Sequence, residues 1–466
     1  MSDALLRAKI GAARASGALS RLAGRGGTSL PGKVLLRLQP DAITRLSRRL
    51  ERGSAVISAT NGKTTTAAMA ASILEGSGAT LVHNRAGANM AGGVAATLMD
   101  AARSRRRLTG DTGLFEVDEF WLDGVVPQLR PRVLLLANLF RDQLDRYGEL
   151  ETIADRWADL VGRIPETHLV LNADDPLVAD LGRHRDGDGN ALAGPGVTYF
   201  GVEDPSAARD GLQHASDSTT CRRCGADYVY DLVYLGHLGH YHCDSCGARR
   251  PTPGLSARDV VLDGVRGARF RLVAPEGDVA ITLPLPGLYN VYNALAAAAL
   301  TRALGATLPE VAAGLASVGA AFGRAETVTI AGRETTLMLV KNPAGANEVL
   351  HTLALEPGEH DLLAVLNDNI ADGRDVSWVW DADFEVLAPQ VRRATCSGTR
   401  AAEMALRLKY AGVPTDRITV VGDLSKGLDA AVAGGSGRLF ALPTYTAMLA
   451  LREELVHRGV TGSSFG

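Results

Sequence analysis

Long hydrophobic runs are absent from this sequence of 466 residues. No run reaches the ~18 apolar residues that a membrane-spanning helix needs, and the first ten residues lack the apolar stretch of a secretory signal. Charge of one sign is not in excess either, because 49 basic and 52 acidic side chains leave a formal net charge of −3. We therefore expect a cytoplasmic protein with no general attraction to nucleic acid or anionic lipid.

Lysine and cysteine are both scarce. Only six of the 49 basic residues are lysines, so Lys63 and Lys341 stand out from an arginine-rich background. The five cysteines are odd in number, and four of them fall in two close pairs, which suits a metal better than disulfide bonds in a reducing compartment. The other residues have the composition of an ordinary globular protein, and the length predicts two or three domains.

Strand-like apolar segments alternate with helix-like segments along most of the chain. This alternation predicts an α/β fold whose central sheet is parallel, doubly wound and covered by helices on both faces. A second series of strands, beginning near residue 336, predicts a smaller Rossmann-like α/β domain. The predicted strands are 55–59, 79–82, 113–117, 133–136 and 168–171 in the first series, and 336–340, 362–366, 394–396, 418–421 and 439–442 in the second.

These patterns divide the chain into three parts. Residues 1–50 form an arginine-rich helical segment, for which partner docking and plain packing are equally good interpretations. Residues 51–328 form the central domain, which is interrupted by an insertion at 203–253. Residues 329–466 form the C-terminal domain.

A phosphate-binding loop is the sharpest local signal. The segment Ser58-Ala59-Thr60-Asn61-Gly62-Lys63-Thr64-Thr65-Thr66 lies between a buried strand and the start of a helix. Backbone N–H groups of such a loop bind an anion, Lys63 can reach the terminal phosphates, and the Thr64 hydroxyl can bind Mg²⁺. Glu116, at the end of a neighbouring strand, is a candidate second Mg²⁺ ligand. Asp118 and Glu119 are equally well explained as a solvated helix N-terminus.

The insertion contains two Cys-x-x-Cys pairs. Their spacing is that of a zinc ribbon, and four thiolates with no open position favour a structural zinc ion. His237, His240 and His242 are interpreted as neighbours of the metal, and Cys396 as a buried core thiol. The proposed ligands are Cys221, Cys224, Cys243 and Cys246.

An Asx-rich segment in the C-terminal domain, residues 366–381, follows an apolar strand and contains Asp375, Trp378 and Trp380. Asn, Asp and Gly can form a tight turn without any chemistry. Two tryptophans beside the turn favour an interface or a ligand surface instead.

The phosphate loop, the segment 138–148 and the sequence Tyr289-Asn290-Val291-Tyr292-Asn293-Ala294 occur in the order found in Mur ligases. The central domain therefore resembles the Mur ligase family, in which ATP phosphorylates a carboxylate and an amine attacks the acyl phosphate. The resemblance implies catalytic roles for Lys63 and Glu116, and Mg²⁺ binding by Thr64 and Glu116. It implies ATP binding by Thr60, Asn61, Gly62, Lys63, Thr64, Thr65, Asn138, Asn290, Asn293 and Arg324.

Two departures from the Mur pattern separate this chain from the amino-acid-adding ligases. Gln143 stands where those enzymes usually have a metal-binding His, which puts a second metal site in doubt. Lys341 replaces the His of a His-Asn-Pro stretch at the start of the third domain.

The chain also resembles a narrower family, MurT, the synthetase subunits of lipid II isoglutaminyl synthase. The resemblance rests on the four cysteines together with Lys341-Asn342-Pro343-Ala344-Gly345 and Asp-Gly-Arg-Asp-Val-Ser-Trp. The resemblance implies ATP-dependent amidation of the α-carboxylate of D-isoglutamate in the lipid II stem peptide, for peptidoglycan synthesis. It also implies a partner, a GatD-type class I glutamine amidotransferase that binds the C-terminal domain. Asp375 of this chain would then be the third member of a catalytic triad with the Cys and His of that partner. Because the lipid tail of this substrate stays in the bilayer, the resemblance further implies that the protein transiently contacts the inner face of the cell membrane.

Two other classes compete with this interpretation. A Mur-type or folylpolyglutamate-type amino-acid ligase is disfavoured by Gln143 and by the four-cysteine insertion. A nucleic-acid-binding zinc-ribbon NTPase would use Arg222, Arg223, Arg249 and Arg250, but the balanced charge of the chain disfavours it.

Overall fold

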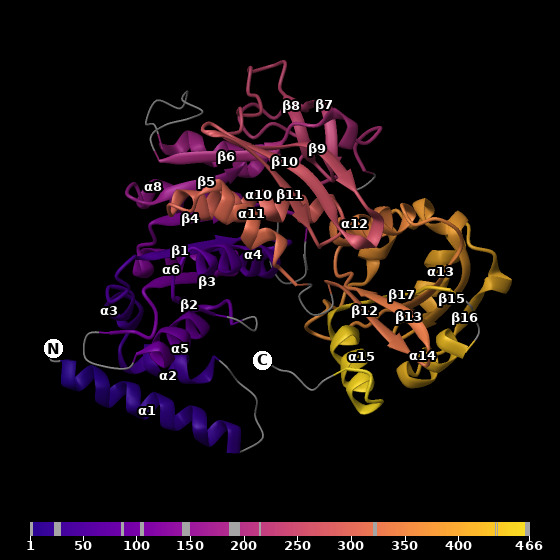
Figure 1. Ribbon diagram of the computed structural model, residues 1–466, viewed down its shortest axis with the longest axis horizontal. Helices are drawn as coiled ribbons and strands as arrows, with labels where there is room; N and C mark the ends of the chain where they lie inside the picture. Colours follow the sequence, from indigo (N-terminus) through magenta and orange to yellow (C-terminus); the bar gives the residue numbers. More distant parts are fainter. Residues whose placement is uncertain are drawn as a thin grey trace.

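Two α/β lobes lie side by side in the computed structural model of the chain (Figure 1). The larger lobe is built on a nine-stranded sheet and the smaller one on a six-stranded sheet. The structure describes residues 3–22, 29–84, 88–102, 107–141, 150–185, 196–213, 216–319, 324–433, 435 and 437–461.

The large sheet has the strand order β11-β10-β9-β6-β5-β4-β1-β3-β2. Its strands pair in parallel from β2 to β9, whereas β10 and β11 extend the sheet as antiparallel strands. The inner strands β1, β3 and β4 are buried along their whole length, as expected for a parallel sheet covered on both faces. The strands are β1 (Ser54–Ser58), β2 (Leu81–His83), β3 (Thr112–Glu116), β4 (Val133–Leu136), β5 (His168–Asn172), β6 (Val197–Val202), β9 (Leu255–Leu262), β10 (Ala268–Ala274) and β11 (Gly277–Leu283).

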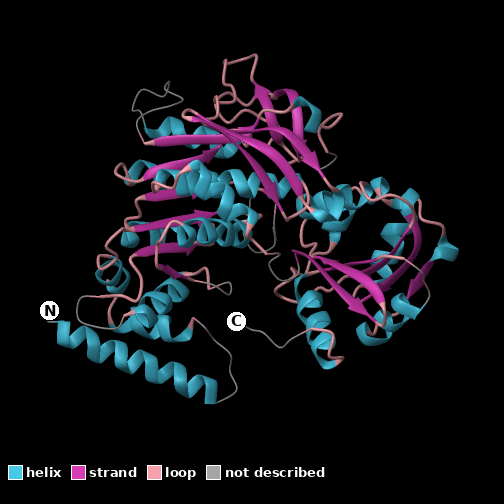
Figure 2. Ribbon diagram, viewed as in Figure 1, coloured by secondary structure: helices cyan, strands magenta, loops and turns pink. Residues whose placement is uncertain are grey.

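Helices cover both faces of this sheet, as Figure 2 shows. Helices α4 (Lys63–Gly76), α10 (Leu288–Ala303) and α11 (Leu308–Ala316) pack on one face. The other face is covered by α5 (Ala91–Ala101), α6 (Leu122–Leu129) and α8 (Leu150–Arg163), with the short α9 (Pro176–Ala179). Helix α4 follows β1 and α8 follows β4 on opposite faces. The carboxyl ends of these adjacent strands therefore border the crevice where doubly wound sheets bind ligands.

Helix α10 is buried on almost every side, because 13 of its 16 residues are buried. It contacts α4 as well as strands β4, β5, β6 and β9. Its alanines make this close approach to the sheet possible, because they occupy little volume. The helix begins at the crevice and carries Asn290 and Asn293 there.

Three N-terminal helices, α1 (Asp3–Leu22), α2 (Leu30–Leu38) and α3 (Ala42–Ser47), extend the large lobe on the α5 side. Helix α1 is the outermost element in Figure 1. Its buried residues Leu6, Ile10 and Ala13 join the core that α2, α3 and α5 share. The inserted residues 203–253 contain an antiparallel hairpin, β7 (Val229–Leu235) and β8 (Leu238–His242).

The small lobe has the strand order β12-β13-β17-β14-β15-β16, parallel except for β12. Helices α12 (Pro343–Ala354) and α13 (Ala401–Tyr410) cover one face, and α14 (Leu424–Ala433) and α15 (Tyr445–His457) cover the other. The strands are β12 (Arg324–Ile330), β13 (Arg333–Met338), β14 (His360–Val365), β15 (Val391–Ser397), β16 (Ile418–Val420) and β17 (Leu439–Pro443).

The predicted fold class is confirmed: a doubly wound α/β domain with an inserted cysteine-rich hairpin precedes a smaller α/β domain. The structure adds strands that the sequence did not predict, among them β6 in the large sheet, the β7–β8 hairpin, and β12, which pairs with β13 as a hairpin. Among the described residues, none of the helices is both long enough and apolar enough to cross a bilayer.

Candidate active site

The phosphate loop lies at the carboxyl end of β1, where the sequence placed it. Gly62 precedes α4 with a φ of +84°, a left-handed conformation that glycine adopts without strain. A Cβ at this position would lie 2.0 Å from Oδ1 of Asn293, so glycine is also required by packing. Asn293 accepts a hydrogen bond from the Thr66 hydroxyl at 3.3 Å and donates to Oδ1 of Asn290 at 3.0 Å. The two α10 asparagines therefore support the loop from one side.

The loop after β4 supports it from the other side. Asn138 accepts from the backbone N–H of Asn61 at 2.9 Å and donates to the Asn61 carbonyl at 3.0 Å, a reciprocal pair. Oγ1 of Thr60 accepts from the backbone N–H of Phe140 at 3.1 Å. Residues from β1, β4 and α10, far apart in the sequence, thus fix the conformation of one short loop.

Lys63 lies among three carboxylates at the entrance to α4. Its Nζ is 2.8 Å from Oε2 of Glu119 and also donates to the Ala59 carbonyl. Burial by itself would lower the pKa of Lys63, but Glu119, Glu116 and Asp118 together raise it above its ordinary value. The raised pKa keeps Lys63 protonated at neutral pH. In the structure Glu119 pairs with Lys63. The sequence alone could not show whether Glu119 is paired or solvated.

Glu116 is buried at the end of β3 and is held from below by Asn84. Oδ1 of Asn84 accepts from the Glu116 backbone N–H at 2.9 Å, and Nδ2 of Asn84 donates to the Glu116 carbonyl at 2.7 Å. This reciprocal pair fixes the Glu116 backbone at the crevice. The Glu116 carboxylate and Thr64 line the same cavity, so both could bind one Mg²⁺ ion there.

The small lobe closes over this site. Asn342, at the N-terminus of α12, donates from Nδ2 to Oδ1 of Asn61 at 2.9 Å, and its own Oδ1 caps α12 by accepting from Gly345 N–H at 2.8 Å. Between the lobes is a cavity of about 400 Å³, a size typical of small-molecule sites. Its walls include Thr60, Asn61, Gly62, Lys63, Thr64, Thr65, Glu116, Asn138 and Asn293 from the large lobe, and Lys341, Gly345, Glu348, Ala371 and Tyr445 from the small lobe.

Two sequence predictions fall outside what the structure describes. Gln143 belongs to the undescribed residues 142–149. Arg324 begins β12, but its side chain is not among the described ones, so its predicted phosphate contact stays a prediction.

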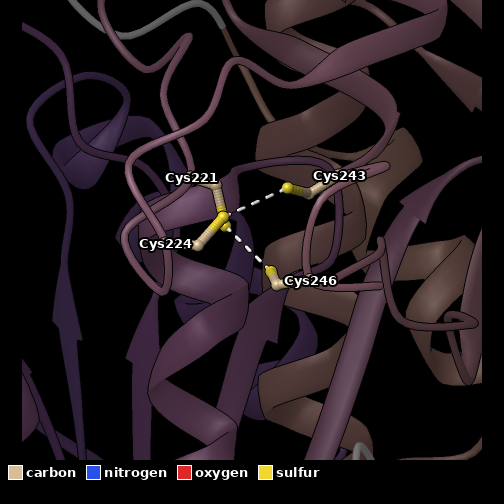
Figure 3. Close-up of side chains that lie close together, drawn as sticks. All are labelled: Cys221, Cys224, Cys243 and Cys246. Carbon is tan, nitrogen blue, oxygen red and sulfur yellow. Dashed lines mark hydrogen bonds between the residues drawn. The ribbon is translucent and has the colours of Figure 1, made fainter.

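The four cysteines of the insertion converge on one point (Figure 3). Their sulfur atoms all lie within 4.8 Å of one another, with Cys221 and Cys246 at 3.6 Å and Cys224 and Cys243 at 3.5 Å. None of them is in a disulfide bond. Four thiolates around one zinc ion at ~2.3 Å would be separated by about 3.8 Å, so the observed cluster fits the ion.

Each Cys pair forms the same small loop. Gly225 N–H donates to the Cys221 carbonyl at 2.7 Å, and Gly247 N–H donates to the Cys243 carbonyl at 2.9 Å. Both glycines have a positive φ, +77° and +74°. Of the three histidines, none joins the cysteine cluster among the described residues.

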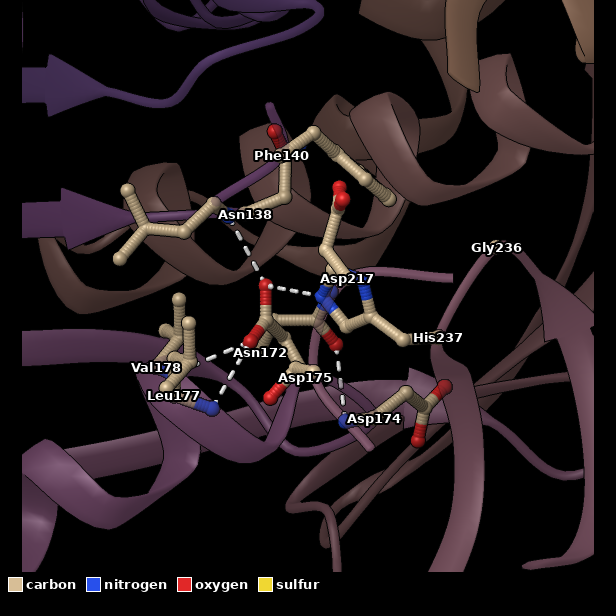
Figure 4. A network of polar contacts seen from close by, with 12 residues as sticks. Asn138, Phe140, Asn172, Asp174, Asp175, Leu177, Val178, Asp217, Gly236 and His237 are labelled. Carbon is tan, nitrogen blue, oxygen red and sulfur yellow. Dashed lines mark hydrogen bonds and ion pairs between the residues drawn. The ribbon is translucent and has the colours of Figure 1, made fainter. Parts of the chain in front are cut away.

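His237 instead lies at the tip of the β7–β8 hairpin, fully buried in the large lobe. Its Nε2 is 3.4 Å from Oδ2 of Asp175, and its ring lies 4.7 Å from that of Phe140, centroid to centroid, at a tilt of 48°. The same Asp175 oxygen accepts from Leu139 N–H at 2.9 Å, while Oδ1 caps α9 (Figure 4). The hairpin that carries the cysteines thus ends directly beneath the loop that holds Asn138.

Asp375 lies apart from the cavity, on the surface of the small lobe. Its Oδ1 accepts from Ser377 N–H at 2.8 Å, and hydrogen bonds from Ser377 hold the pKa of Asp375 below its usual range. It belongs to the same loop as Ala371, which lines the cavity. Trp380 and Tyr410, with 45% and 67% of their surface exposed, form an aromatic pair at 5.8 Å on the same lobe.

Several solved ligases share this architecture. The chain superimposes on a pseudomurein peptide ligase type C from Methanothermus fervidus with a TM-score of 0.67, at 22% identity over 89% of this chain and 80% of that one. It superimposes on the Thermotoga maritima MurF ligase in complex with ADP with a TM-score of 0.62, at 14% identity over 92% of this chain and 85% of that one. Residues 57–225 match the Mur ligase middle domain. The fold and the site define an ATP-dependent ligase of the Mur type.

The C-terminal part narrows this class to one family. Residues 339–448 match the MurT ligase C-terminal family. Over 444 residues, 95% of each chain, the sequence is 35% identical to the MurT subunit of the glutamine-hydrolysing lipid II isoglutaminyl synthase of Streptococcus pneumoniae. It is 33% identical to the MurT subunit of Staphylococcus aureus strain N315, over 94% of each chain. The chain belongs to the MurT family.

Proposed function

We propose that the chain activates the α-carboxylate of D-isoglutamate in the lipid II stem peptide as an acyl phosphate, and that ammonia from a GatD-type glutaminase converts it to the amide. The observation that carries this proposal is the cavity between the lobes. Its large-lobe wall contains a phosphate loop and Lys63, and its small-lobe wall contains Ala371, four residues before the exposed Asp375.

In the first step, a substrate carboxylate oxygen attacks the γ-phosphorus of ATP, the bond to the bridging oxygen breaks, and ADP leaves. Backbone N–H groups from Gly62 to Thr65 and the Lys63 ammonium would face the phosphates and offset the charge that develops on them. Thr64 and Glu116 would hold Mg²⁺, which supplies further charge neutralisation when bound. The carboxylates around Lys63 keep its ammonium protonated throughout.

In the second step, ammonia attacks the acyl carbon, the carbon–oxygen bond to the phosphate breaks, and the amide and phosphate form. Water must be kept from the acyl phosphate until ammonia arrives, because hydrolysis would waste ATP. The Asn61–Asn342 contact supports such a closed arrangement, since it joins the phosphate loop to the small lobe over the cavity.

Ammonia would come from the partner subunit docked on the small lobe. Asp375 is exposed and ionised, as the third member of a Cys-His-Asp triad must be to orient a histidine of the partner. Four residues of chain span at most ~14 Å, so the path from Asp375 to the cavity wall is short. The exposed Trp380–Tyr410 pair and Ile370, which is 73% exposed, support a docking surface around it.

A zinc ion held by the four cysteines would keep the insertion folded, since a closed set of four thiolates leaves no position for substrate. Because the substrate is lipid-linked, the chain would work at the inner face of the membrane without crossing it.

The decisive experiment incubates the purified chain with Mg-ATP, detergent-dispersed lipid II and ammonium, and separately with glutamine and the partner. The stem peptide is then followed by mass spectrometry. We expect a product one mass unit lighter with ammonium alone, and with glutamine only when the partner is present. Unchanged lipid II, with ATP consumed in the presence of another carboxylate and a free amino acid, would identify an amino-acid ligase instead.

A further inference from the structure

Positive charge in this chain is concentrated at its beginning. Residues 1–52 contain eleven basic and three acidic side chains, although the whole chain has a net charge of −3. A compositional preference for arginine over lysine cannot explain this, because it would not separate basic from acidic residues along the sequence. The segregation points to a surface that meets a negatively charged partner.

The described residues among them lie on helices α1, α2 and α3, or within five residues after α3, at the far end of the large lobe (Figure 1). Since α1 buries Leu6, Ile10 and Ala13 against the lobe, its opposite side faces solvent. The basic side chains here are mostly exposed, among them Arg7, Arg14, Lys33, Arg37, Arg48 and Arg52.

The sequence contains a second basic run, whose neighbour Ala102 contacts α1. Arg14 of α1 donates to the carbonyl oxygens of Met99 and Ala102, at 2.5 and 3.0 Å. Ala102 is followed in the sequence by Arg-Ser-Arg-Arg-Arg at 103–107, of which Arg107 is described and exposed. Ala102, the residue before that run, therefore lies next to α1.

Leucine side chains are exposed among the basic ones. Leu5 on α1 and Leu30 and Leu38 on α2 expose 43%, 39% and 42% of their surface. Basic residues interspersed with exposed leucines fit a lipid headgroup layer, where arginine and lysine meet lipid phosphates and leucine enters the acyl boundary. A nucleic acid would use the charges but would leave the leucines in water.

We propose that the basic face of α1 and α2 docks the chain on an anionic bilayer. The choice of a membrane over other anions rests on the proposed function, because a lipid-linked substrate requires the enzyme to work at a membrane surface. Docking through the N-terminal helices would leave Asp375 and the aromatic pair of the small lobe free for the partner subunit.

The test measures co-sedimentation of the full-length chain with vesicles of phosphatidylcholine alone and of phosphatidylcholine with 40% phosphatidylglycerol. We expect binding to the anionic vesicles that weakens as salt rises from 50 to 300 mM, because screening shortens the reach of each charge. The triple variant Arg7→Glu, Lys33→Glu and Arg37→Glu should lose at least tenfold in affinity. A matched triple variant of exposed basic residues elsewhere, Arg258→Glu, Arg269→Glu and Lys426→Glu, should lose much less.

Three outcomes would overturn the proposal: equal binding to neutral and anionic vesicles, equal losses in the two triple variants, or binding to a DNA duplex that exceeds binding to anionic vesicles and is lost in the same variant. Ammonium-driven amidation of detergent-dispersed lipid II needs no bilayer, so the N-terminal variant should retain it. Failure of that reaction in the unsubstituted chain would refute the proposed function, whereas normal reaction without vesicle binding would refute only the docking surface.

Discussion

Asn342 of the small lobe donates a hydrogen bond to Oδ1 of Asn61 in the phosphate loop, at 2.9 Å, across 281 residues of sequence. The same side chain caps α12 through its Oδ1. One residue therefore couples the conformation of the phosphate loop to the position of the small lobe.

The Asn342→Asp variant separates these two roles. Aspartate keeps the oxygen that caps α12 but loses the donor to Asn61 and adds negative charge near the phosphates. We expect unchanged thermal stability and a KM for ATP raised about tenfold. Asn342→Ala, the comparison, should also lose about 1 kcal/mol of unfolding free energy with the cap. Steady-state kinetics and thermal melts provide both readouts, and an unaltered KM in both variants would exclude the coupling.

Asp375→Asn should abolish amidation with glutamine, by at least about 100-fold, because an amide cannot stabilise a protonated histidine of the partner. The ammonium-driven reaction should persist, since Asp375 is not part of the cavity wall. Asp416→Asn is the control, because Asp416 is also an exposed aspartate of the small lobe. It lies in the 3-10 turn Thr415–Arg417. Equal loss of both reactions in Asp375→Asn would disprove the triad role.

Removing the imidazole of His237 should leave Asp175 buried without its cationic partner. We expect His237→Phe to lower the free energy of unfolding by about 3 kcal/mol and His237→Gln, which keeps an N–H donor, by less. Burial opposes protonation, but Asp175 raises the pKa of His237 above its ordinary value. The stabilisation is then complete below about pH 6.5 and is lost as the pH rises through the folded-state pKa. Urea unfolding of parent and variants from pH 6 to 9 tests this, and parallel pH profiles would contradict it.

His351, on α12, should make the stability of the protein depend on pH in the direction opposite to His237. Burial, and then the charge of Arg209, lower its pKa to about 4. Arg209 also pairs with the buried Glu348 at 2.6 Å and so connects the base of the insertion to α12. The folded state resists protonation of His351, so stability should be lost as the pH falls from about 6.5 toward 4. His351→Gln should flatten the profile in this window, and an unchanged slope would rule out His351 as its source.

Metal removal should unfold the insertion. We expect chelation, or Cys224→Ser, to lower the melting temperature, because the fold of the two small loops depends on four thiolates held together. Cobalt added to the metal-free chain should give the absorption bands of tetrahedral thiolate coordination. If cobalt produces no such bands, the cluster does not bind a metal in this way.

The sequence predicted those features that depend on neighbouring residues. Strands such as Val133–Leu136 are continuous apolar runs, and the phosphate loop is defined by nine consecutive residues. Strand β12 was missed because its sequence mixes polar and apolar residues and it lies at the edge of the small sheet, where it pairs with β13.

Contacts made by tertiary folding could not be predicted in the same way. His237 and Asp175 meet only because the β7–β8 hairpin folds back onto the large sheet. Glu119 was indistinguishable from a solvated residue until the position of Lys63 was known. The residues proposed to bind ATP were identified from the resemblance to Mur ligases, and their roles stay predictions.

Helix α10 limits which amino-acid substitutions this protein can accept during evolution. Because almost all of its residues are enclosed, a larger side chain in the run Ala294–Ala299 would displace the helix and, with it, Asn290 and Asn293 beneath the phosphate loop. Sequence drift and inhibitor-resistance mutations should therefore accumulate on exposed loops and on the part of the small lobe that lies away from the cavity, where a substitution does not shift the phosphate loop. A compound that contacts the α10 end of the cavity would meet the part of the enzyme that is least able to change.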